Sequence, residues 1–155
     1  MATRSDGRAA EPRAGRAAPP RVPYPQIALA LLGAWSIFPP YVGPVLGLEL
    51  NVAAKVEVVD HVVPGVSIAL CAALAALLAR RGAEAEYGTP ALVLGGVCFL
   101  GGLWQAATHA PLVFDAGGSE APWGAVLLHS TPGPALVVVA LWLILRTPKG
   151  ERVAA

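Results

Sequence analysis

The stretch from Glu57 to Arg81, EVVDHVVPGVSIALCAALAALLARR, decides the fold of this chain. Residues 57–79 form an apolar block, and a helix needs about 20 such residues to cross the hydrocarbon layer of a bilayer, which is roughly 30 Å thick. Two arginines follow the block at once, which is typical of the cytoplasmic end of a spanning helix. This stretch therefore predicts a transmembrane helix.

Three further apolar blocks predict an all-α, polytopic membrane protein with four transmembrane helices. They cover approximately residues 25–46, 89–111 and 123–145. Of the 155 residues, 55% are hydrophobic and only 14% are charged, whereas soluble domains have about 25% charged residues. The composition excludes an ordinary soluble domain. The net charge of +1 gives no basis for nucleic-acid binding.

The basic residues predict that both termini are cytoplasmic. Ten of the eleven lysines and arginines lie in the terminal segments or after the second block, and only Lys55 lies on the opposite side. Residues 1–25 carry five arginines among Ala, Gly and Pro and predict a disordered basic tail. Residues 26–146 would form the membrane domain, surrounded by the lipid of the cell membrane, and residues 147–155 a second cytoplasmic tail.

Two short motifs, G-x-W and H-x-x-P-G, recur in the two halves of the chain and predict an internal repeat. The first half has Gly33, Trp35, His61, Pro64 and Gly65, and the second has Gly102, Trp104, His129, Pro132 and Gly133. The tryptophan precedes the histidine by 26 residues in the first half and by 25 in the second. We expect repeat units at about residues 26–80 and 90–146, arranged as two tandem hairpins of the same orientation.

The sequence GAWSIFPPYVG at residues 33–43, followed by DHVVPG at residues 60–65, resembles the SPW-repeat integral membrane proteins. The resemblance covers about residues 26–80 and, more weakly, residues 90–145. The family's Ser-Pro-Trp triplet is replaced here by FPPY at residues 38–41 and by THAP at residues 108–111. The resemblance implies a membrane topology and a duplication, and it implies no reaction, because that family has no established activity.

Three histidines are expected at one level of the membrane. His61 and His129 each precede a proline by three residues and would lie in the outer third of their helices, while His109 would lie at the outer end of the third block. Each proline leaves the carbonyl four residues earlier without its helical partner. With Asp60 beside them, these residues predict a polar pocket that opens outward. Their pattern fits interhelical packing contacts as well as a binding site.

Small residues at helical spacing predict close helix contacts. Gly65 and Gly133 lie one turn below the first and last histidines, on the same helix faces. A face of the third block carries Gly95, Cys98, Gly102, Gln105 and His109. We expect this face to point inward. Cys98 and Cys71 are interpreted as packing residues, because free cysteines behave as small hydrophobic residues.

The sequence favours a structural or accessory membrane component that binds a membrane-protein partner, or a second copy of itself, through its glycine-rich helices. Two alternatives stay open. The histidines could bind a transition metal or haem, or they could act with Asp60 in proton-linked sensing or transport. The sequence has no phosphate-binding loop, no G-x-S-x-G and no G-x-G-x-x-G, so neither an enzyme nor a bound cofactor is predicted beyond the metal or haem alternative.

Overall fold

We describe the chain from a computed structural model, which gives the placement of residues 22–48, 50, 53–82, 88–115 and 122–146. These residues are helices and short connections, with no strand among them. Most of the predicted N-terminal tail and the tail at residues 147–155 lie outside the described residues.

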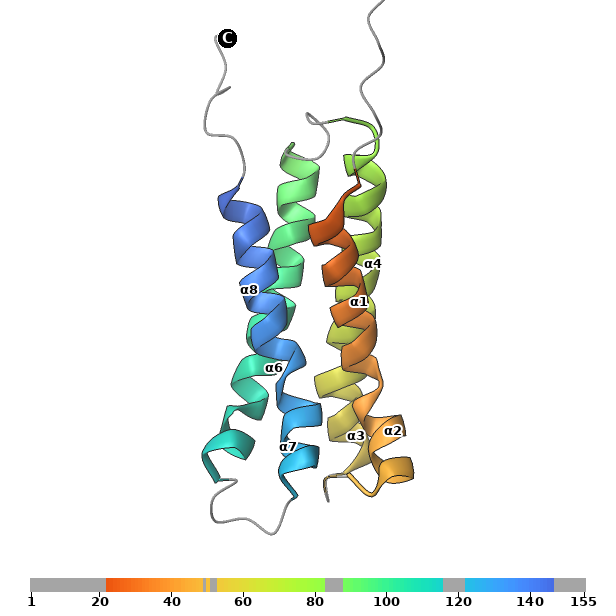
Figure 1. Cartoon of the computed structure of the whole chain (residues 1–155), viewed down its shortest axis with the longest axis vertical. Helices are drawn as coiled ribbons and strands as arrows, with labels where there is room; N and C mark the ends of the chain where they lie inside the picture. Colours follow the sequence, from red (N-terminus) through yellow and green to blue (C-terminus); the bar gives the residue numbers. More distant parts are fainter. Residues whose placement is uncertain (1–21, 49, 51–52, 83–87, 116–121, 147–155) are drawn as a thin grey trace, which may run out of the picture.

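The helices form a bundle of four rods (Figure 1). They are α1 (Tyr24–Ile37) with α2 (Pro39–Leu46), α3 (Ala54–Glu57) with the π-helix η1 (Val58–Val62) and α4 (Val63–Ala79), α6 (Thr89–Asp115), and α7 (Trp123–Ser130) with α8 (Pro132–Leu145). Helix α1 packs against α4 and α8, and α6 packs against the same two helices. The core between the rods is therefore shared by all four.

The two ends of the bundle differ. The start of α1 and the end of α8 lie at one end, which we call the termini end (Figure 1). The other end is formed by α2, α3, η1, α7 and the last turns of α6, and we call it the histidine end. Because α1 with α4, and α6 with α8, are paired along the chain, the fold consists of two helical hairpins packed side by side.

Three to four helices of this fold could cross a membrane. The segments Lys55–Ala79, Thr89–Phe114 and Trp123–Leu145 are each long and apolar enough. The fourth candidate is the pair α1 and α2, which is bent by 56°. These lengths are compatible with a multi-pass membrane protein.

The first apolar block differs from the single continuous span that the sequence predicts. It breaks at Phe38, whose N–H bonds to the carbonyl of Trp35. The next two residues, Pro39 and Pro40, have no N–H to continue the helical ladder. The helix then restarts in a new direction, where the N–H of Val42 bonds to the Phe38 carbonyl at 2.8 Å.

Small and medium apolar side chains fill the core, and large ones cover the outside. The core cluster comprises Leu29, Ile68, Ala72, Cys98, Leu136, Ala140 and Leu143. Each rod also carries an outward apolar side chain that is about two-thirds exposed, namely Leu31, Leu70, Leu100 and Val138. A soluble monomer rarely exposes so much apolar surface, so this exterior suits contact with lipid.

Glycines allow the helices of each hairpin to approach closely. A Cβ atom added at Gly65 would lie 2.9 Å from the carbonyl oxygen of Gly33, and one added at Gly102 would lie 3.2 Å from that of Gly133. A Cβ atom at Gly133 would lie 2.5 Å from the backbone nitrogen of Ala106. Gly95 has more room, because the nearest atom, in the Ile144 side chain, would be 3.7 Å away.

Candidate functional site

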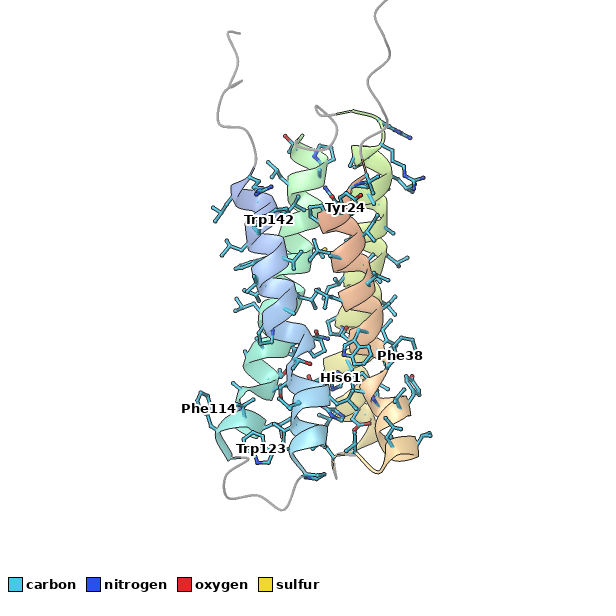
Figure 2. The ribbon with its side chains drawn as sticks, viewed as in Figure 1. Tyr24, Phe38, His61, Phe114, Trp123 and Trp142 are labelled. Atoms are coloured by element: carbon cyan, nitrogen blue, oxygen red, sulfur yellow. The ribbon has the colours of Figure 1, made fainter. Side chains whose placement is uncertain are left out.

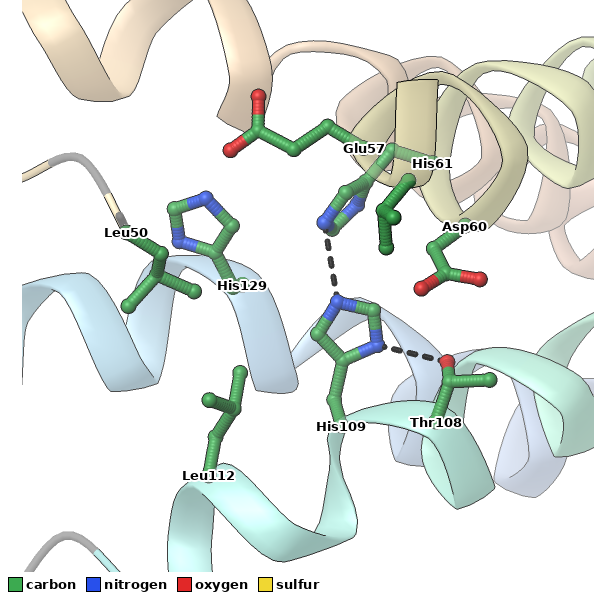
Figure 3. Close-up of a pocket in the computed structure, with 9 residues that line it drawn as sticks. Leu50, Glu57, Asp60, His61, Thr108, His109, Leu112 and His129 are labelled. Atoms are coloured by element: carbon green, nitrogen blue, oxygen red, sulfur yellow. Dashed lines mark hydrogen bonds between the residues drawn. The ribbon is translucent and has the colours of Figure 1, made fainter. Parts of the chain in front are cut away.

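All three histidines of the chain meet at the histidine end, and we call His61, His109 and His129 the histidine cluster (Figures 2 and 3). They come from η1, α6 and α7, and all three are buried. The ring centroid of His61 lies 4.6 Å from that of His109 and 5.3 Å from that of His129. The cluster therefore draws one histidine from the first hairpin and two from the second.

Prolines and a π-helical turn set the position of His61. Because Pro39 and Pro40 have no N–H, the carbonyl of Ser36 has no partner within its own helix. The Nδ1 atom of His61 lies 3.2 Å from this carbonyl oxygen. His61 itself lies in η1, which closes with a bond from the N–H of Val63 to the carbonyl of Val58.

His109 and His129 are anchored in another way, each to the carbonyl one helical turn earlier. The Nδ1 atom of His109 lies 2.9 Å from the Gln105 carbonyl oxygen, and that of His129 lies 2.8 Å from the Ala125 carbonyl oxygen. The hydroxyl of Thr108 is also 3.0 Å from Nδ1 of His109. In all three rings, Nδ1 thus faces a backbone carbonyl.

These anchors favour one tautomer of each ring. A carbonyl oxygen can only accept a hydrogen bond, so a hydrogen on each Nδ1 makes all three anchors hydrogen bonds, and a neutral ring then leaves Nε2 as a bare acceptor. The Nε2 atoms of His61 and His109 face each other at 3.0 Å (Figure 3). In these tautomers the contact would join two lone pairs, which repel unless a proton or another cation lies between them.

The third ring adds one more free acceptor. The Nε2 atom of His129 is buried and has no hydrogen-bond partner in the described part of the chain. Leaving a buried polar atom without a partner costs about 1–3 kcal/mol. Because a cavity adjoins the cluster, water or a ligand there could supply the missing partner.

Gln105 links the two hairpins next to the cluster. Pro64 deprives the carbonyl of Asp60 of its helical partner. The side-chain Nε2 of Gln105 donates to that carbonyl oxygen at 3.4 Å. Gln105 thereby holds the turn that carries His61, while its own backbone carbonyl anchors His109.

A cavity of about 150 Å³ adjoins the cluster. It is lined by Leu50, Val56, Glu57, Asp60, His61, Thr108, His109, Leu112 and His129. The side chains of Glu57 and Asp60 are partly exposed, so the cavity reaches the surface beside two carboxylates (Figure 3). A small cation could enter there.

The arrangement is not a ready-made metal centre. Within the described ranges, no three His, Cys, Asp or Glu side chains are placed so that they could hold a metal ion together. Two rings already face each other, and the third stands beside them. In this arrangement His61 and His109 could not be the two axial ligands of one haem, because axial ligands lie on opposite faces of the macrocycle and these two Nε2 atoms are only 3.0 Å apart.

No family model, curated protein or solved structure matches this chain. The resemblance to the SPW-repeat proteins therefore stays a prediction. The interpretation of the site rests on its own geometry.

The sequence-based candidate residues fall into two groups. The three histidines and Asp60 line one cavity. The glycines lie away from it, and Gly65, Gly95, Gly102 and Gly133 are all buried between helices. Ser36, Glu57, Thr108 and the amide of Gln105 also belong to the site, and the sequence did not indicate a role there for any of them. Pro40 and Pro64 were the sequence features that could have indicated these contacts. Each leaves a backbone carbonyl without its helical partner, and a side chain from another helix then bonds to that carbonyl.

Proposed function

We propose that this chain is a four-span membrane protein that binds a cation at the histidine cluster. One observation carries the proposal. Three buried imidazoles are each fixed through Nδ1 to a backbone carbonyl, at 3.2, 2.9 and 2.8 Å, which leaves three Nε2 acceptors in one small region. Acceptors gathered in this way, with no donor of their own, favour a positively charged ligand.

The proposed placement in the membrane counts the bent pair α1 and α2 as the fourth span and puts both termini in the cytoplasm. Among the described basic residues, Arg80, Arg81 and Arg146 follow helices that end at the termini end, whereas Lys55 lies in α3 at the histidine end. Basic residues concentrate on the cytoplasmic side of membrane proteins. The histidine cluster would then face the outside.

Aromatic side chains at both ends support this placement. Tyr24 and Trp142 lie at the termini end, and Trp123 lies at the histidine end (Figure 2). The guanidinium of Arg146 stacks over the Trp142 ring at 4.1 Å, so a cationic and an aromatic group share one level. Aromatic rings at two levels are typical of the two interfaces of a bilayer.

The equivalent glycines of the two hairpins support the proposed tandem duplication. Gly33 and Gly65 approach each other in the first hairpin, as Gly102 and Gly133 do in the second. The tryptophans of the two G-x-W motifs are also similar in exposure, at 48% and 52%. This correspondence fits two hairpins of the same orientation.

The apolar interior of the bundle favours a binding site at the histidine end and disfavours transport of an ion through the bundle. On the cytoplasmic side of the cluster, the core consists of apolar side chains such as Leu29, Ile68 and Leu136. A charged ion could not cross this region without losing its hydration. The cation would therefore enter and leave at the histidine end.

An accessory role through glycine-rich helices remains a second prediction. The tight glycine contacts described above lie between helices of this same chain, so they leave those surfaces occupied. A partner would have to use another surface, such as the one at Gly96, where an added Cβ atom would meet nothing within 4 Å.

Nuclear magnetic resonance of ¹⁵N-histidine-labelled protein tests the proposed function. In metal-free protein we expect all three Nδ1 atoms to carry a hydrogen, a bare Nε2 in His129, and a proton shared between Nε2 of His61 and Nε2 of His109. A His129→Gln variant assigns the signals, because it removes one ring from the spectrum. Rings that carry their hydrogen on Nε2 and leave Nδ1 bare would contradict the proposal.

A further inference from the structure

We infer that the histidine cluster binds a transition-metal ion of the zinc type, with Nε2 of His61, His109 and His129 as its three protein ligands. This inference rests on the proposed function, because it identifies the cation that the cluster binds. Three observations support it: the donors are imidazole nitrogens, the Nε2 atoms of His61 and His109 lie close together, and the Nε2 atom of His129 has no partner among the described residues.

The donors select the class of metal. Three neutral imidazole nitrogens suit Zn²⁺ and its neighbours among the transition metals. Mg²⁺ and Ca²⁺ prefer oxygen ligands, six or more for Ca²⁺, and the cavity offers the carboxylates of Glu57 and Asp60 only at its surface. The nitrogen donors are also buried, whereas a hydrated hard cation would need a larger polar site.

The Nδ1 contacts match the usual support of metal-binding histidines. A histidine ligand nearly always donates its other ring N–H to a carbonyl, a carboxylate or water, which fixes the tautomer and orients the ring. Each histidine of the cluster has its Nδ1 atom at hydrogen-bond distance from a backbone carbonyl. Nε2 is therefore the nitrogen of each ring that stays available for ligation.

The spacing of the first two donors is close to what a tetrahedral metal requires. With Zn–N bonds of about 2.0–2.1 Å and tetrahedral angles, two nitrogen ligands lie about 3.3–3.4 Å apart. The Nε2 atoms of His61 and His109 are 3.0 Å apart. Metal binding therefore needs these two Nε2 atoms to move apart by a few tenths of an ångström.

His129 must move toward the other two rings to complete the set, because the described residues do not yet place three ligands around one ion. Its Nε2 atom has no partner among the described residues, so moving it to a metal breaks no hydrogen bond of that atom. The junction of α7 and α8 lacks part of its helical ladder, because Pro132 and Pro134 have no N–H. The inference requires the helix to bend at this junction so that the ring comes within reach of the other two.

The cavity provides the fourth position. A water molecule occupies about 30 Å³ in the liquid, and the cavity of about 150 Å³ can hold several. One of these waters would complete a tetrahedral shell, and the carboxylates of Glu57 and Asp60 could accept its hydrogens. A site with an open position at the surface exchanges its metal with the outside.

The test is metal binding by the full chain in detergent, purified through a tag that contains no histidine. After treatment with a chelator, we expect one Zn²⁺ or Co²⁺ per chain. His129→Gln should weaken binding by at least about 100-fold, which exceeds the usual effect of losing an outer-shell partner. Ser130→Ala is the matched control, because its hydroxyl is buried beside His129 and lies outside the cavity lining.

A second measurement works on the unmodified chain, so it does not depend on the variants folding. The ¹¹³Cd resonance of Cd²⁺-loaded protein distinguishes nitrogen ligands from cysteine sulfur, and we expect the nitrogen range. The double variant Cys71→Ala, Cys98→Ala should bind as the natural chain does. Absence of stoichiometric binding, or binding that is lost with the cysteines and kept in His129→Gln, overturns the inference.

The two proposals fail in different ways. If the histidine spectrum shows Nδ1 hydrogens and a proton shared between His61 and His109, but no metal binds, the metal inference is wrong and cation binding stands. If the rings carry their hydrogens on Nε2, both proposals fail.

Discussion

The Nε2 atom of His61 lies 3.0 Å from the Nε2 atom of His109, and this contact joins the first hairpin to the second. The Nδ1 atom of each ring lies at hydrogen-bond distance from a backbone carbonyl, that of Ser36 for His61 and that of Gln105 for His109. In the proposed tautomers both facing nitrogens are acceptors, so the proposed cation would lie at the junction of the hairpins. Stability and ligand binding would then be coupled at this point.

A double-mutant cycle measures that coupling. We expect His61→Ala and His109→Ala each to lower the free energy of unfolding in detergent, and the double variant to cost less than their sum by about 1–3 kcal/mol. Gln26→Ala, at the termini end, combined with His109→Ala is the control and should be additive. Full additivity for the two histidines would mean that their contact is absent in solution.

Adding one methyl group tests the glycine contacts. A Cβ atom at Gly133 would lie 2.5 Å from a backbone nitrogen, so Gly133→Ala forces α6 and α8 apart and should cost about 1–3 kcal/mol. Gly96→Ala is the control in α6, where the Cβ meets nothing within 4 Å. It should stabilise by up to about 1 kcal/mol, because alanine is the better helix former. Equal melting temperatures for the two variants would show that the helices are not in close contact at Gly133.

Two buried glutamines should respond differently to the same substitution. Gln105→Leu removes the bond to the Asp60 carbonyl and should destabilise by about 1 kcal/mol. Neither amide atom of Gln26 has a partner in the described part of the chain. Gln26→Leu should therefore leave stability unchanged or raise it. Thermal melting in detergent measures both, and destabilisation by Gln26→Leu would reveal a partner for its amide.

Much of this fold can be predicted from hydrophobic block length alone. The second and fourth blocks, at residues 57–79 and 123–145, match the long apolar helices of the structure within a few residues. The third block continues four residues further, through Pro111 to Asp115. The break at Phe38 could not be placed from hydropathy, because the apolar run continues across it. There the missing N–H groups of two prolines decide the geometry.

The site could be predicted in part. Helical spacing and the repeat put the three histidines at one level, but neither could say which rings face each other. That depends on the π-helical turn before Val63, which turns His61 toward the neighbouring helices. The role of Ser36 was also hidden, because a carbonyl becomes available only through prolines further along the chain.

Labelling with a membrane-impermeant thiol reagent tests the topology. In the Cys71→Ala, Cys98→Ala background, cysteines introduced at Asn51 and Gly118 should react from outside intact cells. A cysteine at Ala83 should react only after the membrane is opened, because Arg80 and Arg81 precede it on the predicted cytoplasmic side. Labelling of position 83 from outside would reverse the proposed orientation and turn the histidine cluster toward the cytoplasm.

The central claim is that His61, His109 and His129 together hold one metal ion. X-ray absorption at the zinc edge of the Zn²⁺-loaded chain tests it most directly. The account predicts three imidazole nitrogens at about 2.0–2.1 Å and one oxygen, with one imidazole fewer in His129→Gln. A shell with sulfur at about 2.3 Å, or one made of oxygen alone, would contradict it.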